Sequence, residues 1–305
     1  MPPLDVAGNR LCLVSVHAHP DDEASKGAGT VAKYTTEGIR CVLVCCTGGE
    51  AGDILNPAMD RPEIVADIAG VRRQELMTAI GILGVRQVDL GFLDSGLPQK
   101  PDDAPDDYEL PPLSPDCFAS QPIEVTGRAL VKIVRRERPH VMVTYDENGG
   151  YPHPDHIACH NVSVEAFDAS GDPDRYPDAG EPWQPSKLYY VHGWHKERLL
   201  TIHDALIERG IESPYGEWLA RWEDKPEDKD RVTTRVRCEE WFELRNAALL
   251  AHATQVDPDG PWFHVPLDLQ REVWPTEDYE LARSLVDTTV PEDDLFAGLR
   301  EPSRT

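Results

Sequence analysis

The chain of 305 residues carries 55 acidic and 30 basic side chains, which gives a formal net charge of −25 and an isoelectric point near 4.7. This balance opposes nucleic-acid binding, because that affinity depends on clustered Lys and Arg that neutralise phosphates. No apolar run approaches the ~18 residues of a membrane span, the N-terminus has no signal-peptide pattern, and the seven cysteines form no C-x-x-C pair, so we expect a cytoplasmic protein without nucleic-acid or membrane partners.

Two near-continuous apolar runs, residues 11–18 and 41–47, are typical of parallel strands that are buried on both faces. The segment between them predicts one helix from Asp22 to Glu37, which would end at Gly38. Strand, helix and strand together fit a right-handed βαβ unit. The N-terminal region therefore predicts the start of a parallel sheet.

The alternation of predicted strands and helices continues along the chain. A helix is predicted from Pro62 to Leu83 and a short strand at 88–90. Helical periodicity then runs from Ile123 to Arg138, and a strand follows at 141–145. The pattern predicts an α/β fold with a Rossmann-like, mostly parallel sheet and flanking helices.

Two regions depart from this alternation. Residues 100–122 are rich in Pro and Asp and predict a long surface loop, either a lid or a subunit contact. We divide the chain into a metal-hydrolase core, 1–185, and a smaller α+β portion, 186–305, that completes the fold and caps the site. The expected elements of that second portion are strands at 187–194 and 231–238 and helices at 198–209 and 239–252.

Two short motifs carry the candidate chemistry: HAHPDDE at 17–23 and YPHPDH at 151–156. Each directly follows a predicted strand, and the carboxyl ends of neighbouring parallel strands meet in one crevice. His19 and Asp22 can reach one ion from the first loop, and His156 can complete the set from the second. Two imidazoles and one carboxylate suit a catalytic Zn²⁺ or Fe²⁺ ion with an open coordination position.

The remaining polar side chains of the motifs suggest an amide hydrolase. Asp21 is adjacent to a predicted metal ligand and is our candidate general base for water activated by the ion. His153, if protonated, could stabilise the oxyanion and protonate the amine leaving group. Tyr151 could donate a second hydrogen bond to the oxyanion.

Each of these residues also has a simpler interpretation. A single His-Pro-Asp triplet is often only a turn, in which Asp22 or Asp155 would cap the following helix. Asp155 could instead orient a ligating histidine. His17 could equally be a buried, hydrogen-bonded side chain. The loops could also belong to a metal-binding interaction module without enzymatic activity.

Both motifs resemble those of the zinc-dependent de-N-acetylase superfamily of LmbE-like and PIG-L-like proteins. The resemblance is strongest to the amidases of this superfamily that act on mycothiol S-conjugates, and it extends over five stretches: Ser25–Gly29, Thr47–Asp60, Leu90–Pro98, Thr144–His156 and Ala251–Gln255. It implies a Rossmann-like fold and one Zn²⁺ per chain on the three ligands named above, with the same base and the same assisting residues.

The resemblance also implies a small-molecule substrate. This would be a thioether conjugate of mycothiol, cleaved at its amide to give a mercapturic acid and glucosaminyl-inositol in thiol-based detoxification. By the same resemblance, Arg72 and Asp94 hold sugar and inositol hydroxyls, while Lys26 selects the bulkier acyl group. Glu50 and His252 are further candidates for the substrate pocket.

Other interpretations stay open. Arg72 and Lys26 could equally be ordinary helix residues in solvent. The alternative activity is the N-acetylglucosaminyl-inositol deacetylase of mycothiol biosynthesis. A homo-oligomer is compatible with the sequence, which contains no motif that settles the oligomeric state.

Overall fold

A computed structural model describes residues 3–99, 109–222 and 231–300. Its centre is one seven-stranded sheet with the strand order β3-β2-β1-β4-β5-β7-β6. The strands are β1 (Cys12–His17), β2 (Arg40–Thr47), β3 (Arg86–Phe92), β4 (Val141–Thr144), β5 (Lys187–Val191), β6 (Thr234–Arg237) and β7 (Thr276–Ser284).

The first five strands are parallel, and β7 runs antiparallel to both of its neighbours. The chain builds outward from β1 in two directions, first to β2 and β3 and later to β4 and β5. In the register, Leu13 of β1 lies opposite Cys41 of β2 on one side and Val141 of β4 on the other. The β1–β4 boundary is therefore the switch point at which α/β sheets form their ligand crevice.

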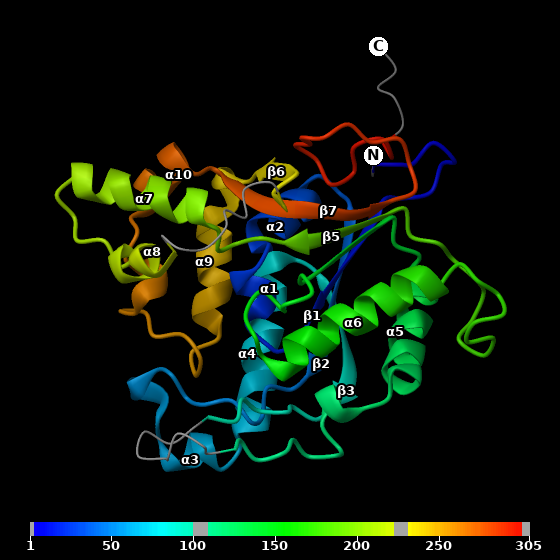
Figure 1. Cartoon of the computed structure of the whole chain (residues 1–305), viewed down its shortest axis with the longest axis horizontal. Helices are drawn as coiled ribbons and strands as arrows, with labels where there is room; N and C mark the ends of the chain where they lie inside the picture. The colour runs from blue at the N-terminus through cyan, green and yellow to red at the C-terminus, as the bar shows by residue number, and fades with distance from the viewer. Residues whose placement is uncertain (1–2, 100–108, 223–230, 301–305) are drawn as a thin grey trace.

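Helices cover both faces of this sheet (Figure 1). The helices of the described part are α1 (Asp22–Ser25), α2 (Ala28–Thr36), α3 (Pro62–Val65), α4 (Ile68–Leu83), α5 (Ile123–Glu137), α6 (Pro154–Ala169), α7 (Lys196–Glu208), α8 (Gly216–Trp222), α9 (Phe242–Ala251) and α10 (Leu267–Val273). Helices α5 and α6 pack against each other on one side, and α2, α4 and α9 pack together on the other. The predicted fold class is confirmed.

The core follows from the apolar runs in the sequence. Every residue of β1 is buried, as are seven of the eight residues of β2. All seven cysteines are buried and unpaired, which fits their role as small apolar side chains. Within the described residues, no helix combines the length and the apolar character needed to cross a bilayer.

The helix predicted from Asp22 to Glu37 is in fact two helices. The break falls at Lys26 and Gly27, and Gly27 has φ +97°, a left-handed conformation that α-helices do not contain. At this point the Oη of Tyr279 lies 3.0 Å from where a Cβ would stand. Tertiary packing against β7 therefore ends the first helix early, a constraint that local periodicity does not contain.

Three further boundaries differ from the prediction. The helix predicted over 62–83 is divided at Asp67, whose side chain accepts the N–H of Gly70 and so starts α4. Strand β3 is longer than expected because it pairs along most of β2. In the predicted loop 100–122, residues 100–108 lie outside the described part, but Phe118 is buried against Phe92 in a short 3-10 helix.

Strand β7 was not predicted, because its sequence TEDYELARS is strongly charged. Its charges are nevertheless accommodated. Glu277 accepts the N–H groups of Gly29 and Thr30 at the start of α2, where the helix dipole favours a carboxylate. Asp278 accepts hydrogen bonds from the rings of His195 and Trp274. Hydrogen-bond donors from distant segments of the chain thus allow these charged residues to form a strand of the sheet.

The conformation of Gly27 leads to a stability prediction. Gly27→Ala should lower the free energy of unfolding by about 1–2 kcal/mol, because an L-residue resists the left-handed conformation and its methyl would press on Tyr279. The matched control is Gly81→Ala within α4, where a Cβ meets nothing within 4 Å. That change should leave stability equal or raise it by up to about 1 kcal/mol. Urea unfolding curves measure both, and equal effects would contradict the interpretation.

Candidate metal centre

The two sequence motifs meet at the switch point of the sheet. The first lies at the end of β1 and leads into α1, and the second lies after β4 and leads into α6. Since β1 and β4 are hydrogen-bonded neighbours that point the same way, both loops emerge at one edge. The predicted convergence of the two segments is what the structure shows.

The three predicted ligands come together at this edge. His19, Asp22 and His156 each offer a ligand atom within 4.8 Å of the others. The Oδ2 of Asp22 lies 3.3 Å from the Nε2 of His156 and 3.6 Å from the Nδ1 of His19. These side chains are almost fully buried, so such a group of charges needs compensation from within the protein or from a bound ion.

The chemistry of His156 fits a metal ion. Its Nδ1 lies 2.9 Å from the carbonyl oxygen of Gly149 and so carries the proton, which leaves the Nε2 as a lone-pair donor. That Nε2 is buried and has no hydrogen-bond partner among the described residues. An unpaired, unprotonated ring nitrogen that faces a carboxylate is the arrangement expected of a metal ligand.

His19 is oriented in a similar way. Its Nε2 lies 3.3 Å from Asp155 and 3.6 Å from Asp94, which leaves Nδ1 facing Asp22. Burial alone would lower the pKa of His19, yet the hydrogen bonds that its ring donates to the surrounding carboxylates raise that pKa well above its usual value. The centre therefore favours positive charge, as a cation site should.

Asp21 stands beside this cluster in an unusual conformation. Its φ of 104° is left-handed, which is rare for a residue other than glycine. Burial, together with the negative charge of Asp22, raises the pKa of Asp21 to about 7. The side chain lines a polar cavity of about 280 Å³ together with His19. Strained backbone of this kind persists where the surroundings fix a side chain, often at functional sites.

His153 and Tyr151 also line the polar cavity. Burial lowers the pKa of His153 to about 4, with His19 and His156 adding to the effect, so the ring is neutral near pH 7. Its Nδ1 accepts the N–H of Asp155, which leaves an Nε2–H group to donate. This pKa direction favours a neutral hydrogen-bond donor over the protonated His153 that we considered from the sequence.

The predicted substrate contacts divide into two groups. Arg72 and Asp94 line the polar cavity, but both are already engaged. The Arg72 guanidinium donates to the carbonyl groups of Gly49, Gly52 and Asp53, and so holds that loop. Asp94 accepts the N–H groups of Ala51 and Gly96. The carboxylate of Glu50 accepts the N–H of Asp94 and braces the same two loops.

Lys26 and His252 flank the cluster on its other side. The Lys26 Nζ donates to Asp22 and Ser25 and lies 6.0 Å from the ring centre of Tyr151. The Nε2 of His252 lies 2.6 Å from Glu23, and although burial alone would lower the pKa of His252, this contact raises it. Lys26 lines a second cavity that is separate from the polar one.

The structure bears on three of the simpler interpretations, namely helix capping, the role of Asp155 and the role of His17. The N-caps of α1 and α6 are Asp21 and His153, so neither Asp22 nor Asp155 has a capping role. Asp155 accepts a hydrogen bond from the backbone N–H of Ser95 and contacts the Nε2 of His19, so it is placed to orient that ring. His17 is the buried, hydrogen-bonded alternative, since its Nε2 lies 2.6 Å from the Oγ of Ser15.

One contributor was missed in the sequence. The buried ring of Tyr145 stacks on His156 with 4.4 Å between centres and 12° between planes. Its hydroxyl accepts the N–H of Ala18, which links the two motif loops. The position ends a predicted strand, and nothing in the local pattern marks its side chain as part of the centre.

The chain belongs to the GlcNAc-PI de-N-acetylase (PIG-L) family, which matches residues 14–167. This confirms the resemblance seen in the sequence. The chain is 50% identical in sequence to a mycothiol S-conjugate amidase of Streptomyces coelicolor, in an alignment that covers 96% of this chain and 99% of that relative. It is 38% identical to a 1D-myo-inositol 2-acetamido-2-deoxy-alpha-D-glucopyranoside deacetylase of Geodermatophilus obscurus, over 94% of this chain and 97% of the relative.

Solved structures share the fold at low identity. An N,N'-diacetylchitobiose deacetylase from Pyrococcus horikoshii is 19% identical, with a TM-score of 0.57 over 88% of this chain and 83% of that one. A 4-carboxy-2-hydroxymuconate hydratase from Pseudomonas putida is 15% identical, with a TM-score of 0.59 over 92% of this chain and 99% of that one. Since deacetylase and hydratase share this fold, the fold alone does not define the reaction.

The geometry predicts how metal affinity responds to substitution. His156→Ala should abolish stoichiometric binding of a divalent ion, because it removes a ligand with a free lone pair. Asp155→Asn should weaken binding roughly 10- to 100-fold through the orientation of His19. Metal content after dialysis and titration with Zn²⁺ measure both. His203→Ala, a change at a histidine that contacts Ser213 instead, is the control and should bind as the unmodified protein does. Retained binding in His156→Ala would refute the ligand set.

Proposed function

We propose that this protein is a zinc-dependent amidase that hydrolyses the amide of mycothiol S-conjugates, giving a mercapturic acid and glucosaminyl-inositol. Family membership and the full-length match to an amidase make the chain a hydrolase that acts on an amide. The observation that carries the metal assignment is the unpaired Nε2 of His156 opposite Asp22. Two imidazoles and a carboxylate suit Zn²⁺, and Fe²⁺ is the alternative.

A bound divalent ion supplies Lewis-acid chemistry, since it lowers the pKa of water and polarises a carbonyl group. The protein supplies the proton transfers. Asp21 faces the polar cavity, and its carboxylate, whose pKa is about 7, is suited to take a proton from the attacking water at neutral pH. The same carboxyl group can return that proton to the amine as it leaves.

The other cavity residues stabilise charge and hold the substrate. The Nε2–H of neutral His153 and the hydroxyl of Tyr151 are donors for the oxyanion that develops at the amide. Arg72 and Asp94 border the same cavity, where hydroxyl groups of a sugar or inositol would lie. Because the main contacts of Arg72 are to the 49–53 loop, we assign it chiefly to shaping this wall.

Two substrates are considered, the amide of a mycothiol S-conjugate and that of N-acetylglucosaminyl-inositol. We choose between them by sequence similarity over the whole chain. Identity to the conjugate amidase exceeds identity to the deacetylase, 50% against 38%, at nearly equal coverage. This favours a bulky S-substituted acyl group over acetyl. We place the protein in the cytoplasm, where mycothiol adducts would be its small-molecule partners, with no nucleic-acid or membrane partner.

The role of Asp21 is tested by Asp21→Asn. Asparagine keeps the shape and tolerates the left-handed backbone, but it cannot take a proton. We expect kcat on a fluorescent mycothiol adduct to fall about 10²- to 10⁴-fold with the metal content unchanged. Amine release and metal analysis measure the two quantities. Undiminished turnover would remove Asp21 as the base, and an unmodified protein inactive on every adduct would favour a metal-binding module.

Lys26→Ser tests which amide the protein prefers. The unmodified protein should have a higher kcat/KM for a mycothiol adduct than for N-acetylglucosaminyl-inositol. The substitution should lower that preference roughly 10-fold, because Lys26 borders the space open to a bulky acyl group. Metal content is measured alongside, since Lys26 also contacts Asp22. A higher kcat/KM for the acetyl compound would identify the biosynthetic deacetylase instead.

A further inference from the structure

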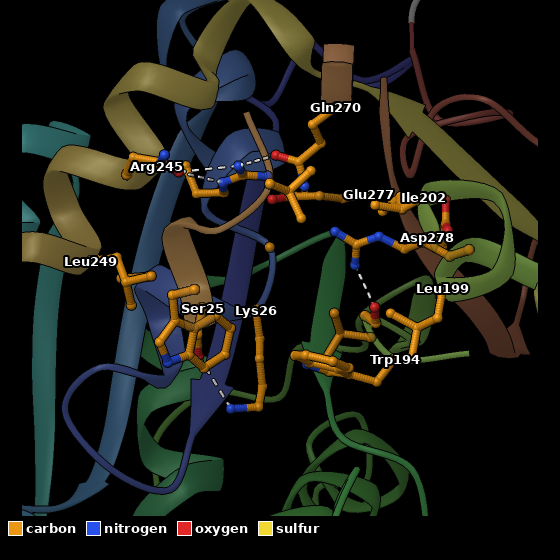
Figure 2. Close-up of a pocket in the computed structure, with 18 of the residues that line it drawn as sticks. Ser25, Lys26, Trp194, Leu199, Ile202, Arg245, Leu249, Gln270, Glu277 and Asp278 are labelled. Carbon is orange, nitrogen blue, oxygen red and sulfur yellow. Dashed lines mark hydrogen bonds between the residues drawn. The ribbon is translucent and has the colours of Figure 1, made fainter. Parts of the chain in front are cut away.

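A second cavity of about 320 Å³ is lined by Lys26 and shares no lining residue with the polar cavity. Its walls come from α1, α7, α9 and the segments around α8 and α10. Figure 2 shows Ser25 and Lys26 at one end of this cavity and Arg245 with Gln270 at the other. A cavity with apolar walls and a few polar groups is the common form of a small-molecule site.

Four aromatic side chains line this cavity, and the ring of Trp194 stands at their centre. It lies 6.1 Å from Tyr215, 6.4 Å from Trp218 and 6.0 Å from Trp262, measured between ring centres. The three indoles come from separate parts of the chain. Despite these contacts, the tryptophans keep much of their surface accessible to solvent: 48% for Trp194, 54% for Trp218 and 45% for Trp262. A cluster of large apolar rings left open to solvent marks a surface that binds something.

The polar groups of this cavity are mostly paired within the protein. Arg245 donates to Gln270, and the Arg198 Nη1 donates to the carbonyl of Gly193. Glu277 and Asp278 accept from α2 and from His195, as described above. One donor, the Nε of Arg198, has no partner among the described residues. Such walls suit an uncharged aromatic group and would accommodate an acceptor atom on it.

Lys26 links this cavity to the metal centre. Its Nζ contacts Asp22, one of the three proposed ligands, while the residue lines the tryptophan-rich cavity. The adjoining residues Ser25 and Gly27 line it too. The acyl side chain of a substrate whose amide lies at Asp22 would enter the tryptophan-rich cavity by extending along Lys26.

We propose that this cavity is the subsite for the group attached to the substrate's sulfur, and that it selects planar, uncharged aromatic substituents. The proposal rests on the proposed amidase function and adds to it the chemical class of conjugate that the protein prefers. Offset and edge-on contacts with the indoles hold the ring. Small alkyl thioethers gain little from the same walls and are the poorer substrates.

The test compares mycothiol conjugates that carry S-benzyl and S-methyl groups. The unmodified protein should show a kcat/KM roughly 10-fold or more higher for the benzyl conjugate, as expected for an apolar group that fills a pocket. Trp194→Ala should remove most of this ratio, because the loss in kcat/KM should be much larger for the benzyl conjugate than for the methyl conjugate. Trp194→Phe, which keeps a ring, should retain an intermediate ratio. Leu200→Ala, at a side chain that is 43% exposed on α7, is the control and should change neither.

A binding measurement separates this proposal from the proposed function. Quenching of tryptophan fluorescence by N-acetyl-S-benzylcysteine and by its S-methyl analogue needs no turnover. Tighter binding of the benzyl compound that is lost in Trp194→Ala supports the subsite even if no conjugate is hydrolysed. Hydrolysis of both conjugates at a ratio that Trp194→Ala leaves unchanged would overturn the subsite and leave the amidase function standing. Equal binding of the two compounds would overturn it as well.

Discussion

The parallel pairing of β1 with β4 is the constraint on which the candidate site depends. It places the carboxyl ends of two strands, more than 120 residues apart in the chain, beside each other, so that both motif loops leave the sheet at one edge. Helices α1 and α6 then start from these loops and fix Asp22 and His156 at their first turns. Every proposed function of the loops follows from this pairing.

Because the two loops converge, several carboxylates are buried close to one another. The carboxylates of Asp22, Asp94 and Asp155 lie within 3.6 Å of the His19 ring, and Asp21 lines the polar cavity with it. Of the cationic side chains beside them, Lys26 contacts Asp22 and Arg72 lines the polar cavity. Arg72 is directed mainly to backbone carbonyls, so the balance stays negative. A divalent cation bound there would offset this repulsion, and the lone pair of His156 Nε2 is the proposed ligand for it. The same electrostatics prepare Asp21 to exchange a proton near neutral pH.

Two cavities of different character adjoin the candidate metal centre, the polar one through His19 and the tryptophan-lined one through Lys26, which contacts Asp22. The polar one holds the proposed catalytic groups and suits a hydroxyl-rich amine portion, and the tryptophan-lined one suits an apolar acyl substituent. Most of the residues that line the second cavity lie beyond the 14–167 region that the family model matches, while Ala24, Ser25, Lys26 and Gly27 lie within it. The proposed acyl subsite would therefore combine one segment of the family region with segments from the C-terminal part of the chain.

The sequence by itself determined the parallel sheet and suggested the candidate ligand set, because near-continuous apolar runs and motif residues at the ends of those runs are both local signals. Tertiary structure decided the break at Gly27, the charged strand β7 and the stacking of Tyr145 on His156. It also brought Trp194, Trp218 and Trp262 to one cavity. These features depend on contacts between segments far apart in the chain, and no spacing within a single segment encodes such contacts.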